Sequence, residues 1–116
     1  MWDETKYLAD HLHEVPVLIL ACIEDDGRSD DFARGATIYP SVQNMLLAAR
    51  GLGLGSCLTT RHRKHEAEIK EMLGIPENVH IASMLPLGFP ADGAKYGPTR
   101  RRPASEVTYY ERWGDT

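Results

Sequence analysis

The chain has 116 residues, enough for one domain and too few for two, so we expect residues 1–116 to form a single domain. A hydrophobic fraction of 42% is compatible with a folded core but somewhat lean, so a partner subunit would add stability. The net charge of −4 argues against broad nucleic-acid binding. No apolar run approaches the roughly 20 residues of a membrane span, and the N-terminus lacks a signal-peptide pattern. These features predict a cytoplasmic protein that binds neither nucleic acid nor membrane.

The two cysteines, Cys22 and Cys57, are far apart, and each lies inside an apolar run. Buried, reduced thiols are the usual state of such residues in cytosolic proteins, and we expect that state here. A disulfide between neighbouring strands is the alternative.

The first part of the chain predicts a helix, a strand and a loop. Residues 2–14 carry a weak helical stripe. Residues 15–23, VPVLILACI, are continuously apolar, which favours a strand buried on both faces, with Pro16 at its first residue or on an edge. Residues 24–34, EDDGRSDDFAR, are acidic and turn-prone but lack the ligand order of an EF-hand. They predict a mobile, solvated loop that could act as a lid beside a site.

A helix is predicted next, within residues 35–60, GATIYPSVQNMLLAARGLGLGSCLTT. Apolar residues recur at helical spacing, and others widen the stripe until little of the circumference is polar, which predicts a buried helix. The stripe consists of Val42, Met45, Leu46 and Ala49, widened by Leu47, Ala48 and Leu52. Pro40 suits the first turn, with Thr37 or Ser41 as the cap, and the glycines from Gly51 onward end the helix.

Two amides, Gln43 and Asn44, lie within this predicted helix. A buried amide needs hydrogen-bond partners, so each is expected to bind the backbone or a ligand. The glycines follow the helix rather than precede one, so they do not fit a dinucleotide-binding turn.

The sequence after this helix predicts two strands and a helix between them. Residues 56–60 favour a short strand, and residues 61–74 an amphipathic helix that begins with the cationic run RHRKH and stops at Gly74. Such a run either holds an anion or is simply solvated. Residues 79–89, VHIASMLPLGF, favour a strand that Pro86 places on an edge, at a bulge, or ends near Leu85.

Histidine pairs occur at residues 11 and 13 and at residues 62 and 65, but neither has a third ligand at useful spacing. We therefore predict no metal site.

The C-terminal segment from residue 90 is rich in glycine and proline and is expected to run irregularly over the surface. It carries Arg100, Arg101 and Arg102 close to Lys95. The planar guanidinium matches phosphate oxygens with two parallel hydrogen bonds, so these arginines either bind a phosphate or pair with the acids of residues 24–31. Residues 107–113, VTYYERW, are β-prone and either form a final strand or pack against another subunit.

Several of these segments together resemble the C-terminal portion of the nitroreductase family of FMN-dependent oxidoreductases. The matching segments are HEVPVLILACIE, QNMLLAARGLGLGSCLTT, MLPLGFP, RRRPASEV and RWG. They occur in the order of the family and at plausible separations, and they cover essentially the whole chain.

This resemblance implies an α+β fold with a central sheet flanked by helices, working as an intertwined homodimer with FMN at the dimer interface. In this family, FMN is reduced by NADH or NADPH and passes electrons to a small-molecule acceptor, often a nitroaromatic or a quinone. The flavin supplies the chemistry, and the protein orients it in a dry pocket.

The resemblance also carries over to particular residues of this chain. Leu58, Thr59, Thr60 and Arg61 match the segment that lines the isoalloxazine. Arg100, Arg101 and Arg102 match the basic positions before a proline, here Pro103, and would hold the FMN phosphate. Thr37, Ile38, Tyr39 and Pro40, before the helix, resemble pocket or interface residues that approach the flavin from the partner chain. No catalytic residue is assigned.

The N-terminal portion of the family, with its arginine-and-serine phosphate motif, has no counterpart in this sequence. The chain is then a fragment, a naturally shortened homologue, or a product that starts at a late initiation codon. Three functions follow: a flavin oxidoreductase, a non-catalytic remnant that binds flavin or phosphate or assembles with a partner chain, and a specialised flavin chemistry such as reductive dehalogenation or flavin breakdown.

Overall fold

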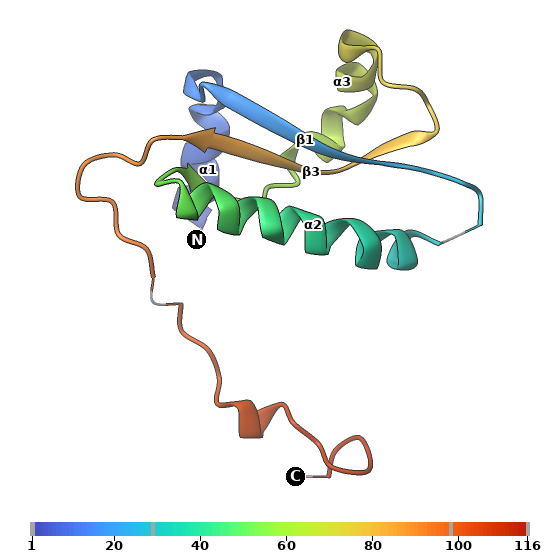
Figure 1. Ribbon diagram of the computed structural model, residues 1–116, viewed down its shortest axis with the longest axis vertical. Helices are drawn as coiled ribbons and strands as arrows, with labels where there is room; N and C mark the ends of the chain where they lie inside the picture. Colours follow the sequence, from blue (N-terminus) through green and yellow to red (C-terminus); the bar gives the residue numbers. More distant parts are fainter. Residues whose placement is uncertain (1, 29, 98, 116) are drawn as a thin grey trace.

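The computed structural model describes residues 2–28, 30–97 and 99–115, with the backbone alone for residues 2–4. Its helices and strands are, in chain order, α1 (Trp2–Asp10), β1 (Val17–Glu24), α2 (Asp31–Gly51), β2 (Gly55–Ser56), α3 (Glu66–Leu73) and β3 (Val79–Gly88). Three 3₁₀ helices, η1 (Leu12–Glu14), η2 (Arg61–His65) and η3 (Ala104–Glu106), connect or follow them. The chain is therefore α+β, as predicted (Figure 1).

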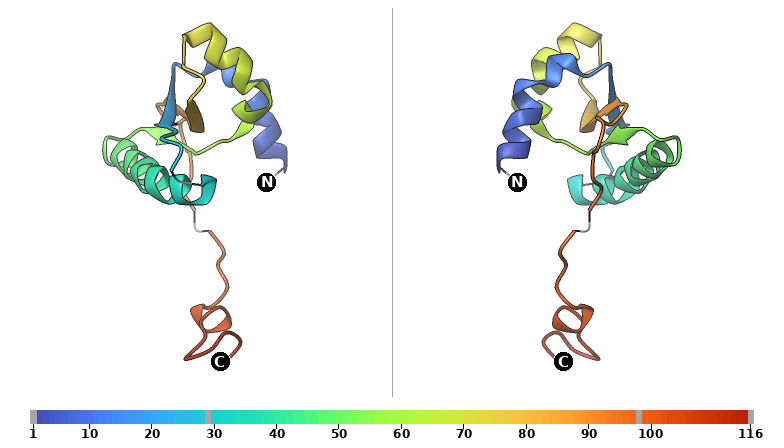
Figure 2. Two further views of the ribbon diagram at one scale, coloured as in Figure 1. Left: turned by 90° about the vertical axis from the view of Figure 1, so that its right-hand side faces the viewer. Right: turned by 90° about the vertical axis from the view of Figure 1, so that its left-hand side faces the viewer.

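The strands form one antiparallel sheet in the order β1-β3-β2, with β3 in the centre. α2 crosses one face of this sheet, while α1, η2 and α3 lie on the other side (Figure 2). The core forms where α2 meets the sheet, from Ala21 of β1, Val42 of α2 and Leu85 of β3. The described part of the chain contains no helix long and apolar enough to cross a bilayer.

Pro86 lies inside the central strand, so its predicted position at an edge, a bulge or a strand end was wrong. The ladder alternates sides, and the N–H and C=O of Met84 point toward Thr59, with both N···O distances 2.9 Å. The nitrogen of Pro86, two residues on, points to the same side. On that side, β3 pairs with Thr59 and then only with Ser56 and Gly55 of β2. Residues 57 and 58, between these pairings, leave the ladder and therefore need no N–H from Pro86.

β1 was predicted to be buried on both faces, but it is an edge strand of this sheet. Val17 is 49% exposed and Leu18 is 42% exposed, whereas Ala21 is buried. A strand with a neighbour on one side, crossed by α2 over part of its length, cannot bury both faces.

α2 begins at Asp31, well before Val42, where its apolar stripe starts, and before either predicted cap. Asp30 caps it, its Oδ1 accepting a hydrogen bond from the Ala33 N–H at 2.8 Å. Pro40 therefore lies inside the helix rather than in its first turn, and Thr37 donates to the carbonyl of Ala33 instead of capping. The carbonyl that Pro40 leaves without an N–H partner is that of Ala36, which lies on the exposed side, where water can take its place.

The prediction that α2 is buried all round was also wrong for this chain. Only one stripe faces the sheet, where Val42 and Ala49 are buried. Leu47 is 60% exposed, and Gln43 and Asn44 are exposed, so their amides can bind water. Leucine and small residues on a helix face without a covering layer leave room for a further packing partner.

The remaining elements follow the predicted order with shorter spans. The segment 61–74 divides into η2 and α3, and α3 ends at Gly74, whose φ of 66° lets its N–H reach the Glu71 and Lys70 carbonyls. The strand predicted at 56–60 is reduced to β2 and a single bridge between Thr59 and Met84.

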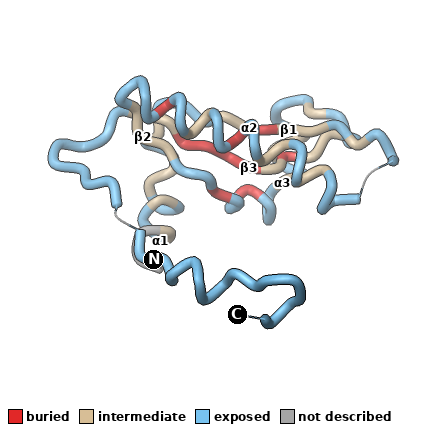
Figure 3. The backbone as a smooth tube through the Cα atoms, turned by 60° about the horizontal axis from the view of Figure 1, so that its bottom comes forward, coloured by how far each residue is buried: buried red, intermediate tan, exposed pale blue. Residues whose placement is uncertain are grey.

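Residues 89–115, here called the C-terminal arm, run away from the sheet and are exposed throughout their described part (Figures 1 and 3). The radius of gyration is 17.4 Å, against about 13 Å for a compact chain of this length. Residues 107–113 form no strand; there, Tyr109 and Trp113 contact one another with ring centroids 4.9 Å apart. Near the start of the arm, the Arg50 guanidinium lies 3.7 Å from the centroid of the Tyr96 ring and joins the arm to α2.

The position of Leu85 predicts a large effect of core truncation. Leu85 is 1% exposed, so Leu85→Ala is expected to lower the free energy of unfolding by about 2–5 kcal/mol. Met72, on α3, is 79% exposed, and Met72→Ala should change it by less than about 0.5 kcal/mol. Urea unfolding of both variants checks this packing, and equal losses would contradict it.

Candidate functional site

The turn after β2 is fixed to the central strand through Thr59. Thr59 is 9% exposed, and its N–H and C=O both bond to Met84. Its Oγ1 also accepts a hydrogen bond from the Arg61 N–H at 3.3 Å. Leu58, Thr60 and Arg61 are exposed on either side of it. The turn therefore presents free polar and apolar groups on a rigid base.

His62 is a second anchor of this region, and its role was missed by sequence reasoning, which considered it only as a metal ligand with His65. It is 3% exposed, and its Nε2 lies 2.8 Å from the carbonyl oxygen of Ile81. A carbonyl only accepts, so Nε2 carries the proton and donates. Flanked by exposed cations in the sequence, His62 gave no signal of burial. Among the described residues, no group of histidine, cysteine and acidic side chains could hold a metal ion.

Tyr39 and Pro40 line a cavity of about 570 Å³ beside the first half of α2. Arg63 of η2 lines the same cavity, which thus lies close to the turn that ends in Arg61. The Tyr39 hydroxyl donates to the Ala82 carbonyl at 3.2 Å and fixes the ring against β3. Both residues lie within α2, not before it as predicted, yet they do face a cavity.

The structure does not bring the arginines of the arm to this turn within one chain. Arg100, Arg101 and Arg102 are exposed on the C-terminal arm, beyond the sheet and α2 (Figures 1 and 2). A site that uses both the turn and these arginines therefore requires the arm of another chain or a different course of this arm.

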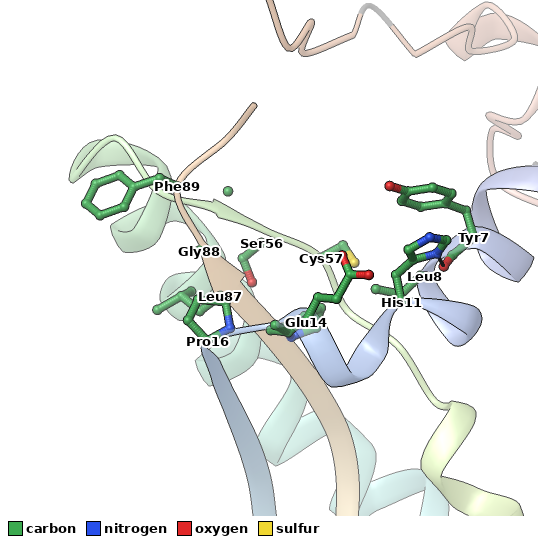
Figure 4. Close-up of a pocket in the computed structure, with 13 residues that line it drawn as sticks. Tyr7, Leu8, His11, Glu14, Pro16, Ser56, Cys57, Leu87, Gly88 and Phe89 are labelled. Carbon is green, nitrogen blue, oxygen red and sulfur yellow. Dashed lines mark hydrogen bonds between the residues drawn. The ribbon is translucent and has the colours of Figure 1, made fainter. Parts of the chain in front are cut away.

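A further cavity of about 400 Å³ opens beside α1, between Tyr7, His11, Cys57 and the residues Leu87–Phe89 (Figure 4). Tyr7 and His11 stack with centroids 3.9 Å apart. Burial raises the pKa of the Cys57 thiol, and burial, followed by Glu66, raises the pKa of the Cys22 thiol.

A raised pKa favours the protonated, less nucleophilic form of both thiols. Both are also free, as predicted, but Cys57 is exposed and Cys22 only half-buried. The alternative of a disulfide was wrong.

The acidic loop predicted to be mobile is held by charge pairs at the start of α2. Arg34 contacts Asp25 and Asp31, each with an N···O distance of 2.6 Å. The N–H of Gly27 donates to Asp25 at 2.8 Å. This hydrogen bond, supported by the nearby Arg34 and His80, holds the pKa of Asp25 below its ordinary value. The loop is shorter than predicted, because α2 begins at Asp31.

Comparisons of the sequence with known proteins identify its relatives. A family model described as the nitroreductase family matches residues 3–89. The chain belongs to the nitroreductase family. The matched range contains the turn and the whole sheet but ends where the C-terminal arm begins.

Three relatives show how much of the family this chain represents. It is 35% identical over 75 residues to a candidate NADH dehydrogenase/NAD(P)H nitroreductase of Archaeoglobus fulgidus, covering 63% of this chain and 43% of that protein. It is 31% identical over 102 residues to the NADPH-flavin oxidoreductase of Vibrio harveyi, covering 72% and 42%. It is 28% identical over 111 residues to the iodotyrosine deiodinase of Drosophila melanogaster, covering 90% and 38%. The chain thus spans less than half the length of each.

The environment of Asp25 predicts a pH dependence of stability. Because its pKa is lowered on folding, its contribution is present above the ordinary value of 3.8 and is lost as the pH falls through the lower folded pKa. The free energy of unfolding of the wild type should therefore decrease as the pH falls below 3.8, and Asp25→Asn should weaken this dependence. Asp92→Asn, on the exposed arm, is the control for net charge. Identical pH profiles for the wild type and Asp25→Asn would contradict the assignment.

Proposed function

We propose that this protein is an FMN-dependent oxidoreductase that accepts electrons from NADH or NADPH and passes them to a small nitroaromatic- or quinone-like acceptor. The observation that carries the proposal is the match of residues 3–89 to the nitroreductase family. The similarity to the NADPH-flavin oxidoreductase of Vibrio harveyi supports the choice of a flavin and a nicotinamide donor. The bound flavin would supply the hydride acceptance and the electron transfer.

The turn of Leu58–Arg61 suits a flat heterocycle. Leu58 is 41% exposed and offers an apolar side chain, while the neighbouring exposed backbone offers hydrogen-bonding groups. Because Thr59 is bonded in both directions to Met84, the turn would hold the ring in one orientation relative to the sheet. In this proposal, Tyr39 and Pro40 contribute from the cavity beside α2 of a partner chain.

The phosphate would be held by Arg100, Arg101 and Arg102 on the arm of a second copy of this chain. Their guanidinium groups suit a phosphate, and they lie away from the turn of their own chain. A homodimer would also cover apolar side chains that one chain leaves in water: Phe32 is 88% exposed, Leu52 77% and Trp113 92%. We therefore propose a homodimer that completes the flavin site.

A second candidate activity is reductive dehalogenation within the same fold. It is favoured by the similarity to iodotyrosine deiodinases of Drosophila melanogaster and Hydra vulgaris, each of which covers 90% of this chain. The alternative outside catalysis is a protein that binds flavin or phosphate, or only assembles with a partner chain.

Absorbance spectroscopy tests the proposal directly. Purified protein supplied with FMN should show oxidised flavin bands that bleach on anaerobic addition of NADH or NADPH and return when a quinone is added. Return of the oxidised flavin bands on addition of an iodinated phenol, together with release of iodide, would favour the dehalogenase. Bound flavin that does not bleach would favour the non-catalytic alternative, and no flavin binding at all would contradict the proposal.

The phosphate assignment predicts a selective loss of affinity. Arg101→Ala should weaken FMN binding by about 10- to 100-fold, because hydrogen bonds to charged groups contribute about 1.5–3 kcal/mol. Riboflavin, which lacks the phosphate, should bind equally to the variant and the wild type. Arg112→Ala removes the same charge from the same arm and is the matched control. Flavin fluorescence titrations measure all of these affinities, and an unchanged FMN affinity in Arg101→Ala would show the assignment to be wrong.

A further inference from the structure

A cavity of about 620 Å³ lies between η2 and α1, on the side of the sheet opposite α2. Its polar lining comes from Thr60, Arg61, His62, Lys64 and His65. It shares Thr60 and Arg61 with the turn proposed to face the flavin. The two places are therefore continuous through the same short segment of chain.

The charge of this cavity is one-sided. No acidic residue is among the described residues that line it, although the chain as a whole carries a net charge of −4. Within the described part of the chain, Arg61 and Lys64 form no ion pair, and His65 lies 3.4 Å from the carboxylate of Glu68. Two permanent positive charges thus converge on a hollow without a neutralising partner.

His62 adds a second, independent observation. It is 3% exposed and lines the cavity, and its Nδ1 is buried without a hydrogen-bond partner. Its Nε2 is already committed to the Ile81 carbonyl. The hydrogen bond from Nε2–H fixes η2 to β3, and with it the backbone that carries Arg61 and Lys64 beside the cavity.

We propose that this cavity binds a phosphate group of the nicotinamide dinucleotide, an inference that rests on the proposed function. The FMN phosphate is assigned to the arm arginines, so the cations of η2 remain for another anion. The donor must place its nicotinamide against the flavin, and Thr60 and Arg61 border both places. The volume lies within the range of about 300–1,000 Å³ of small-molecule pockets and suits part of a dinucleotide. The phosphate comes either from the pyrophosphate, common to both donors, or from the 2′-phosphate of NADPH.

Lys64→Gln tests this proposal, with Arg63→Gln as its matched control. The two residues are adjacent in η2 and carry the same charge, but Arg63 lines the cavities beside α2 and not this one. Long-range electrostatic effects of the two substitutions are therefore similar, and only the direct contact differs. Both side chains are exposed, so folding should be retained, which circular dichroism checks.

Calorimetric titration of the full chain with inorganic pyrophosphate gives a readout that needs neither flavin nor turnover. Lys64→Gln should weaken pyrophosphate binding about 10-fold, and Arg63→Gln should weaken it far less. Equal binding by the two variants, or no binding by the wild type, would overturn the proposal.

Steady-state kinetics then separate the two sources of the phosphate. If the cavity takes the 2′-phosphate, Lys64→Gln raises the KM for NADPH and not for NADH, with kcat unchanged. If it takes the pyrophosphate, both KM values rise. An unchanged KM for both donors would overturn the donor assignment. A wild type that binds pyrophosphate through Lys64 but binds no flavin would contradict the proposed oxidoreductase while leaving the anion cavity in place.

Discussion

The hydrogen bonding of the central strand β3 determines where the other strands, the turn and η2 lie. β1 pairs along one edge of β3, and β2 and Thr59 pair along the other. Elsewhere on β3, the Ile81 carbonyl accepts a hydrogen bond from Nε2–H of His62 and holds η2. The turn that we assign to the flavin and the cationic segment that follows it are therefore both fixed to one rigid strand. A backbone ladder is well suited to this task, because its register allows no small displacements.

The same small sheet leaves much of the chain uncovered. Three strands cannot bury both faces of β1 and all sides of a 21-residue helix. The exposed stripe of α2 and the aromatic residues of the C-terminal arm are the surfaces that a further layer would cover. A chain with an uncovered helix and an extended arm gains more from association than a closed monomer does. This is the physical basis for proposing that a second copy completes the site.

Apolar runs and glycine stops predicted the order of the elements because they are local signals, and the family resemblance predicted the α+β class. Sequence reasoning failed where the answer depended on tertiary pairing. The apolar stripe of α2 concealed its true start, which depends on the cap at Asp30. Pro86 was assigned to an edge, a bulge or a strand end, because the sequence does not show that residues 57 and 58, opposite it, leave the ladder. The burial of His62 was equally invisible, since its carbonyl partner is 19 residues away in the sequence.

The candidate site, too, could be predicted from the sequence only in part. Family resemblance assigned the turn of Leu58–Arg61 to the flavin, and the structure supplies the reason the turn is rigid. Tyr39 and Pro40 were assigned to a segment before the helix, yet as parts of α2 they still line a cavity. The position of Arg100–Arg102 relative to the turn depends on the course of the arm, which local sequence patterns do not encode.

The central claim is that the flavin site is assembled from the turn of one chain and the arm of another. Native mass spectrometry of the FMN-loaded protein tests it most directly. The account predicts flavin bound to a species of twice the 13.0 kDa chain mass, and no flavin retained on the single chain. Flavin held tightly by a species of one chain mass would contradict it.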